Sequence, residues 1–293
     1  KMYVTLEPCS HHGLTPPCTN IIIKSKIKEV IYSVVDIDKR VRNKSLKILK
    51  ANNIKVKKGL FEDKINNFYS TYFFNRKNQL PYVTGKIAVS KNNLIYSKLD
   101  KKITNKHSDK FTHLLRYKND ALMVSYKTLN KDNSKLNCRI KGFSNYSPKR
   151  IILDNKLQTK INSYVIKTAN KDNTIIFYNQ ADKSKILDFK KKKIQLIKSK
   201  VNEQGKFDVK AILKKLYSFN CRNLLIEGGD SLTNHLLKNR IFNKFYLYKS
   251  PKNLSKEIEY VKFNSLGVLK KNYKKLFNLK LFLEKDKITL YKN

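Results

Sequence analysis

The 293 residues carry 64 Lys and Arg against 22 Asp and Glu, a formal net charge of +42. With 40% apolar residues the chain can bury cores, so neither a disordered polymer nor a single small module fits; its length predicts two domains. The charge directs attention to phosphate-bearing partners, whether nucleic acid, an anionic membrane or a phosphorylated metabolite.

The positive charge is almost all lysine, spread along the chain with abundant Asn and Ile. These residues share A/T-rich codons, so we interpret the charge as compositional drift; base readout and bidentate phosphate recognition favour arginine. No window of about 18 apolar residues exists, which argues against a spanning helix. The 4 cysteines are too few and scattered for a secreted disulfide framework, which indicates a reducing cytoplasm.

Residues 1–75 predict a small α/β domain. Its expected elements are a strand at 2–6, an irregular loop at 7–18, a helix at 21–27 capped by Thr19, a strand at 30–34, a helix at 44–51, a strand at 54–56 and a helical stretch at 62–74. Strands that alternate with helices predict a parallel sheet. Because the first strand begins without a cap or turn, we expect an upstream part to be missing.

A polar linker at 76–80 is expected to lead into a second α/β domain, residues 81–293. Its predicted strands are 82–90, 121–124, 150–153, 174–178, 194–197, 223–226 and 244–248, its helices 108–117, 208–219 and 231–238, and a hairpin near 279–290 closes it.

Two cysteines in the first loop suggest a metal site. Cys9 and Cys18 each follow a proline, and they stand between a strand and a helix, so both thiolates can face one ion. Zinc deaminases combine such a half-site with an upstream His-x-Glu, which this sequence lacks. The alternative is a pair of ordinary buried cysteines.

The loop sequence TLEPCSHHGLTPPC resembles the deaminase signature of the bifunctional riboflavin-biosynthesis deaminase–reductase family. The resemblance implies that residues 1–75 are part of a cytidine-deaminase-like domain, with Cys9 and Cys18 as zinc ligands. It places the third ligand, a His, and the catalytic Glu before Lys1, and His11 and His12 off the metal. We therefore predict that this chain does not deaminate.

The resemblance continues through the second domain, for which it implies a dihydrofolate-reductase-like fold. Residues 81–90 are similar to the opening strand of the family's reductase domain, which implies Ala88 as a cofactor contact. Residues 128–139 match its Thr-x-x-x-Asp-x-Pro-x-Leu-x-x-Arg loop, with Ser134 in place of Pro. By this match Thr128 and Asp132 contact NADPH, and Leu136 lines the substrate pocket.

Two arginines are candidates for binding a ribose phosphate. Planar, permanently charged guanidinium groups suit a phosphate dianion, and Arg116 and Arg139 are among few arginines in a lysine-rich chain. The resemblance assigns both to the substrate. The alternative is a surface arginine without a ligand.

A Glu-Gly-Gly turn joins the strand at 223–226 to the next helix, where free backbone N–H groups can approach a dinucleotide phosphate. The resemblance implies that Glu227 contacts the substrate. It assigns to NADPH the residues Gly229, Asp230, Ser231, Leu232 and Thr233, together with Asn155 after the strand at 150–153.

One stretch, Ser90 to Thr104, departs from the family pattern: Lys102 replaces a Trp, and a charged residue replaces a Ser. The resemblance as a whole implies an NADPH-dependent reduction of 5-amino-6-(5-phosphoribosylamino)uracil, with Glu227 as the titratable candidate for handling a proton. An inactive paralogue kept as an assembly subunit and a basic nucleic-acid-binding protein are the alternatives. We expect no specific nucleic acid or membrane partner, and a homodimer by analogy.

Overall fold

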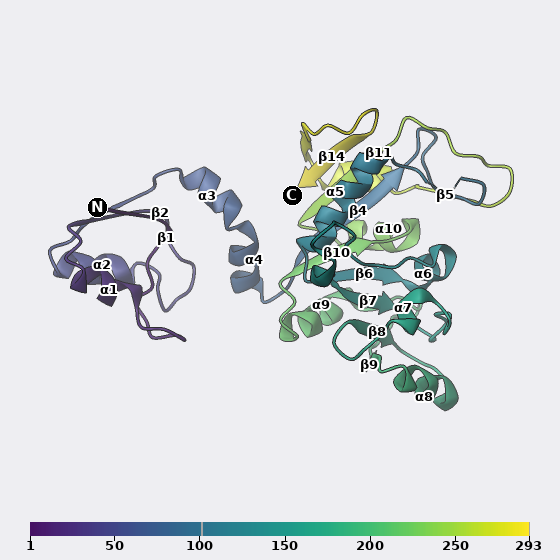
Figure 1. Cartoon of the computed structure of the whole chain (residues 1–293), viewed down its shortest axis with the longest axis horizontal. Helices are drawn as coiled ribbons and strands as arrows, with labels where there is room; N and C mark the ends of the chain where they lie inside the picture. The colour runs from purple at the N-terminus through teal and green to yellow at the C-terminus, as the bar shows by residue number, and fades with distance from the viewer. Residues whose placement is uncertain (101, 293) are drawn as a thin grey trace. The chain divides into compact units, whose positions relative to one another are not determined.

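The computed structural model describes residues 1–100 and 102–292; Lys101, in the stretch that departs from the family pattern, lies outside them. The chain divides into two compact units, Lys1–Leu80 and Pro81–Asn293 (Figure 1). Within the described residues no helix combines the length and apolar character needed to cross a lipid bilayer.

Unit 1 contains a three-stranded parallel sheet of order β1-β2-β3, as the alternating elements predict. Ile22, Val30, Leu49 and Ile54 join its first two helices to the sheet in one buried cluster. The elements are β1 Met2–Leu6, α1 Cys18–Lys24, β2 Glu29–Val34, α2 Lys44–Ala51, β3 Lys55–Lys58, α3 Glu62–Phe68 and α4 Ser70–Asn78.

Two boundaries in unit 1 differ from expectation. Thr19 does not cap α1; its N–H donates to the Cys9 carbonyl at 3.2 Å, and the helix already begins at Cys18. The helix α4 continues through Asn78, so the first part of the expected linker at 76–80 is helical.

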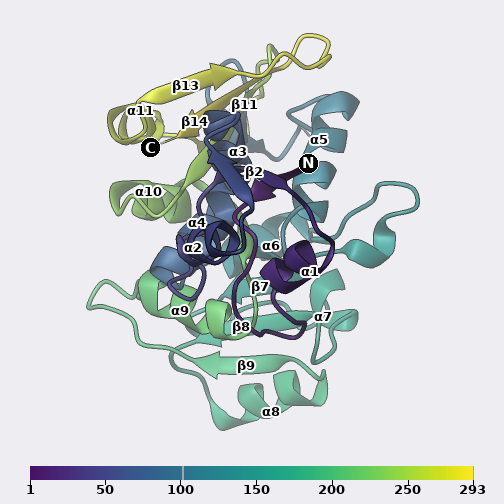
Figure 2. The same ribbon diagram turned by 90° about the vertical axis from the view of Figure 1, so that its left-hand side faces the viewer.

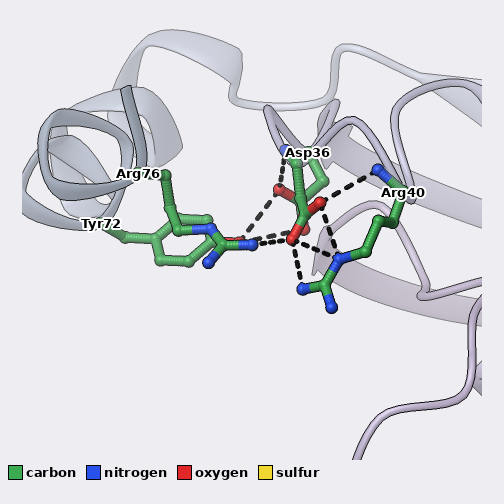
Figure 3. A network of polar contacts seen from close by, with 5 residues as sticks. Asp36, Arg40, Tyr72 and Arg76 are labelled. Atoms are coloured by element: carbon green, nitrogen blue, oxygen red, sulfur yellow. Dashed lines mark hydrogen bonds and ion pairs between the residues drawn. The ribbon is translucent and has the colours of Figure 1, made fainter. Parts of the chain in front are cut away.

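A polar network fastens α4 to the loop after β2 (Figure 3). The Tyr72 hydroxyl donates to Asp36 Oδ1 at 3.1 Å, and Arg40 and Arg76 both pair with Asp38. Burial, together with the Asp36 carboxylate, raises the pKa of Tyr72 to about 12. The hydroxyl therefore stays protonated well above neutral pH and keeps donating to Asp36.

Unit 2 is built on a nine-stranded sheet of order β13-β14-β11-β4-β10-β6-β7-β8-β9. From β11 to β9 every neighbouring pair is parallel, whereas β14 pairs antiparallel with both β11 and β13. The strands are β4 Tyr82–Val89, β6 Ala121–Ser125, β7 Lys149–Leu153, β8 Thr174–Tyr178, β9 Gln195–Lys198, β10 Asn223–Glu227, β11 Lys244–Lys249, β13 Lys275–Asn278 and β14 Lys287–Lys292.

Helices cover both faces of this sheet: α9 and α10 lie on one face, and α5, α6 and α7 on the other (Figure 2). Their bounds, with those of the remaining helices, are α5 Lys106–Tyr117, α6 Tyr126–Asp132, α7 Tyr164–Lys167, α8 Lys183–Lys191, α9 Val209–Ser218, α10 Asp230–Lys238 and α11 Leu266–Asn272, with a 3-10 turn at Ser144–Tyr146. The chain crosses over one face while it adds strands towards β9 and returns over the other, as right-handed connections require.

Several elements of unit 2 were not expected. The helix α6 occupies the start of the matched 128–139 loop, because the Ser125 side chain caps it by accepting from the Thr128 N–H at 3.4 Å. Two short strands, β5 Leu94–Ser97 and β12 Tyr260–Lys262, pair with each other apart from the main sheet. The closing hairpin is formed by β13 and β14, so the range 279–290 holds mainly its connection.

The strand β4 is the first strand of this sheet in chain order, and the direction in which later strands are added reverses beside it. After β9 the chain returns to place β10 between β4 and β6, then crosses to place β11 on the other side of β4. In open parallel sheets such a reversal leaves a crevice at the carboxyl ends of the strands. The ends of β4, β6 and β10 are therefore where a ligand site is expected.

Candidate active site

A cavity of about 660 Å³ lies at these carboxyl ends, within the usual size range of small-molecule sites. The sheet, α6, the start of α10 and the β5–β12 pair all contribute to its wall. Its lining residues are Lys86, Ile87, Ala88, Ile95, Tyr96, Ile103, Ser125, Lys127, Thr128, Lys131, Asp132, Glu227, Gly228, Gly229, Asp230, Ser231, Leu232, Tyr260, Val261, Lys262 and Asn264.

Most residues assigned to the cofactor from the sequence meet in this cavity: Ala88, Thr128, Asp132, Gly229, Asp230, Ser231 and Leu232. Two do not line it. The Thr233 side chain is buried and donates to the Gly228 carbonyl at 3.4 Å, and Asn155 donates through Nδ2 to the Gly205 carbonyl at 3.3 Å.

The Gly228–Gly229 turn brings backbone to the cavity at the start of α10. A Cβ on Gly228 would lie 3.2 Å from Leu232 Cδ2, and one on Gly229 would lie 3.7 Å from Thr128 Oγ1. Asp230 follows, but its Oδ1 already accepts from the Ser265 hydroxyl at 2.6 Å and from two backbone N–H groups. Asp230 thus holds the segment before α11 against α10.

Glu227, at the end of β10, forms a bidentate ion pair with Arg116 of α5. Both N–O distances, from Nε to Oε1 and from Nη2 to Oε2, are 2.8 Å, and the side chains are only 11% (Arg116) and 15% (Glu227) exposed. Burial opposes ionisation of Glu227, but the Arg116 and Lys86 charges outweigh it and hold its pKa at about 2. At neutral pH Glu227 is therefore a carboxylate that accepts hydrogen bonds.

Of the residues assigned to the substrate, Glu227 lines the cavity, whereas Arg116, Leu136 and Arg139 are outside its lining. Arg116 is engaged by Glu227 and also donates to the Asn137 carbonyl at 3.2 Å. Arg139 is exposed, and its Nη1 donates to Asn137 Oδ1 at 3.0 Å. Leu136 is 2% exposed and packs into the core of unit 2 with a positive φ of 50°.

Lys86 is a site residue that the sequence analysis missed. It lines the cavity from β4, and its Nζ lies 4.8 Å from the centroid of the Tyr248 ring. Burial lowers the pKa of Lys86, while the Glu227 carboxylate opposes this shift. Lys86 could have been identified from the sequence, because it is the one charged residue in the apolar strand predicted at 82–90.

The expected metal ligands of unit 1 lie together. The Cys18 N–H donates to Cys9 Sγ at 3.2 Å, and hydrogen bonding with Cys9 raises the pKa of the Cys18 thiol. Among the described residues no group of three or more His, Cys, Asp or Glu is placed to hold a metal ion. Zinc takes at least three protein ligands, so the two cysteines alone do not form a zinc site.

Residues 85–278 match the family described as the RibD C-terminal domain. The riboflavin biosynthesis protein RibD of Aquifex aeolicus is 31% identical over 286 residues, which are 95% of this chain and 77% of the relative. RibD of Actinobacillus pleuropneumoniae is 31% identical over 252 residues, covering 85% of this chain and 66% of that protein.

Solved structures share the fold. Acinetobacter baumannii RibD superimposes with a TM-score of 0.79 at 21% identity, over 98% of this chain and 79% of that one. The Thermotoga maritima diaminohydroxyphosphoribosylaminopyrimidine deaminase/5-amino-6-(5-phosphoribosylamino)uracil reductase superimposes with a TM-score of 0.79 at 24% identity. The match covers 99% of this chain and 78% of that one. These matches confirm the resemblance seen in the motifs. The chain therefore belongs to the RibD family of riboflavin biosynthesis proteins and carries its C-terminal, oxidoreductase domain.

Proposed function

We propose that unit 2 reduces 5-amino-6-(5-phosphoribosylamino)uracil to its ribitylamino product with NADPH. The observation that carries this proposal is the cavity, which joins the Gly228–Gly229 turn to the ionised Glu227 and to Lys86. When bound, the reduced nicotinamide supplies the hydride for C1′ of the opened ribose. The protein's part is to hold the two reacting carbons together.

The residues of the cavity fit a dinucleotide phosphate. The Gly-Gly turn leaves backbone N–H groups open at the start of α10, where the helix dipole favours an anion. Of the lysines in the lining, Lys86 lies near Glu227, and Lys131 pairs with Glu259. In the described part of the chain, Lys127 and Lys262 form no ion pair, which leaves both for phosphate groups.

Glu227 and Lys86 supply opposite charges in the wall of the cavity. The carboxylate can accept from a substrate hydroxyl or N–H, and the ammonium can donate to a carbonyl. Arg116 acts through Glu227, which it keeps ionised. Arg139, exposed and permanently charged, is the guanidinium that we propose for the substrate phosphate.

The direct experiment follows the loss of reduced-nicotinamide absorbance when the chain is mixed with NADPH and the phosphoribosylaminouracil. We expect oxidation that depends on substrate and that collapses in Arg139→Ala. NADPH binding without turnover would favour the inactive paralogue. No NADPH binding would contradict the proposal.

Removing both free lysines should weaken cofactor binding. We expect Lys127→Met combined with Lys262→Met to raise the Kd for NADPH about tenfold, because two charge-assisted contacts to phosphate are lost. Titration of NADPH fluorescence measures this. Lys185→Met on α8 is the control, since Lys185 does not line the cavity. An unchanged Kd in the double variant would place the phosphates elsewhere.

We propose further that residues 1–75 are part of a zinc deaminase domain, which a linker joins to the reductase. The support is the Cys9–Cys18 pair and its loop sequence. The homodimer stays a prediction, which analytical ultracentrifugation would test.

This chain should release no ammonia from the diaminopyrimidine substrate, even with added zinc. The sequence contains no His-x-Glu motif to complete the metal site and carry the proton. An ammonia assay coupled to glutamate dehydrogenase, with a blank lacking the chain, measures the outcome. A signal above the blank would contradict the prediction.

A further inference from the structure

The β5–β12 pair forms one wall of the cavity. Its strands run antiparallel, with Tyr96 opposite Val261, and they are separate from the nine-stranded sheet. We call residues 94–97 and 260–262 the ribbon; Figure 1 shows its first strand, β5, away from the strands of the main sheet. Ile95, Tyr96, Tyr260, Val261 and Lys262 of the ribbon all line the cavity.

Backbone hydrogen bonds at the two ends of the ribbon tie its strands to each other. The Lys98 N–H donates to the Glu259 carbonyl at 2.8 Å, and the Phe263 N–H to the Asn93 carbonyl at 2.8 Å. These bonds hold the ribbon together but do not join it to α6, which forms another part of the cavity wall.

Lys131 of α6 makes that connection. Its Nζ lies 2.6 Å from Glu259 Oε1 and 3.8 Å from the centroid of the Tyr96 ring. The Lys131 ammonium thus forms a cation–π contact with Tyr96 of β5 and an ion pair with Glu259, the residue directly before β12. Among the residues that the structure describes, this is the only ion pair between α6 and the ribbon or its flanks.

We propose that Lys131 is a positioning residue that latches the ribbon to α6 and thereby sets how fast the cofactor enters and leaves the cavity. This inference rests on the proposed function. The Lys131 side chain is 25% exposed and that of Glu259 57%, so water and salt weaken the contact. A latch of this strength opens readily, which suits a lid that must admit and release a ligand in every turnover.

Lys131→Met tests the latch because it removes the charge and keeps most of the side-chain length. We expect the dissociation rate of NADPH, measured by stopped-flow fluorescence, to rise about tenfold, the upper end for such contacts. The KM for NADPH should rise, while the single-turnover rate at saturating NADPH stays unchanged. Lys131→Arg should restore the wild-type rate, because a guanidinium can also pair and stack.

Partner variants sharpen the assignment. Tyr96→Leu and Glu259→Gln should each raise the NADPH dissociation rate by part of the increase seen in Lys131→Met. Combined with Lys131→Met, neither should raise that rate by as much as it does alone. Lys135→Met is the matched control: Lys135 lies over Tyr164 at 5.3 Å, and neither residue lines the cavity. It should leave the dissociation rate unchanged.

A second readout needs no cofactor. The chain contains no Trp, so Tyr96→Trp places a single strong fluorophore in the latch and keeps an aromatic face for Lys131. Acrylamide quenching of this Trp should increase when Lys131→Met is added, but not with Lys135→Met. If Lys131→Met increases the quenching but NADPH does not bind to the protein, the contact between Lys131 and the ribbon is supported and the proposed function is contradicted. If NADPH is bound and oxidised, but neither quenching nor the dissociation rate responds, the latch is wrong.

Discussion

Replacing Arg116 by Met should lower the free energy of unfolding by about 3 kcal/mol, the cost typical of removing one partner of a buried ion pair. The Glu227 carboxylate, 15% exposed, would lose both of its 2.8 Å hydrogen bonds and keep only the nearby Lys86 charge. Urea unfolding measures the change as a lower midpoint at constant slope. Adding Glu227→Gln to Arg116→Met should recover part of the loss, because the uncompensated charge is removed.

The same pair predicts a pH dependence. The folded-state pKa of Glu227, about 2, lies below its ordinary value of 4.5. Its contribution to stability is therefore fully present above about pH 4.5 and is lost as the pH falls towards 2. In Arg116→Met this acid-dependent loss should shrink.

Lys102→Met is the control for the pair, since Lys102 contacts Asp109 of the same helix α5 at 3.2 Å but is 72% exposed. An exposed ion pair of this kind should cost less than about 1 kcal/mol. Should Arg116→Met cost no more than Lys102→Met, the Arg116–Glu227 pair would not contribute to the stability of the fold.

The parallel strands could be predicted because their signal is local. Runs such as 121–124 and 174–178 are apolar on both faces and bounded by polar residues, as strands covered by helices on two sides must be. The ribbon could not be predicted in this way. Its strands are short, and each is a strand only because it pairs with a segment more than 160 residues away.

The candidate site also combines residues that a local motif identifies with residues that only the fold brings together. The Gly228–Gly229 turn and the residues after it are contiguous, so one motif identified most of one wall. Arg116 and Glu227 are 111 positions apart, and their pairing follows from the crossing of α5 over the sheet. A motif assigned each of them to a substrate, but only the fold shows that they bind each other.

Gly85, at the centre of β4, is expected to tolerate no side chain. It lies opposite Ile226 of β10 and Phe245 of β11, and an added Cβ would come 2.2 Å from Phe245 Cδ2 and 2.7 Å from Phe242 Cε1. Both rings are 1% exposed and pack against each other at 5.1 Å, so neither can move without opening the core. Gly85→Ala should therefore cost about 3 kcal/mol, the upper part of the range for overpacking.

Gly267→Ala, in α11, is the matched control, because nothing lies within 4 Å of the added Cβ. It should stabilise the protein by about 0.5 kcal/mol, since alanine favours a helix and restricts the unfolded chain. Thermal unfolding of the two variants should thus shift in opposite directions. Gly85 directly precedes Lys86, so the strain in Gly85→Ala should also displace the cavity wall and weaken NADPH binding, which Gly267→Ala should leave intact. Equal unfolding temperatures would contradict the close approach of β4 and β11 on which that wall depends.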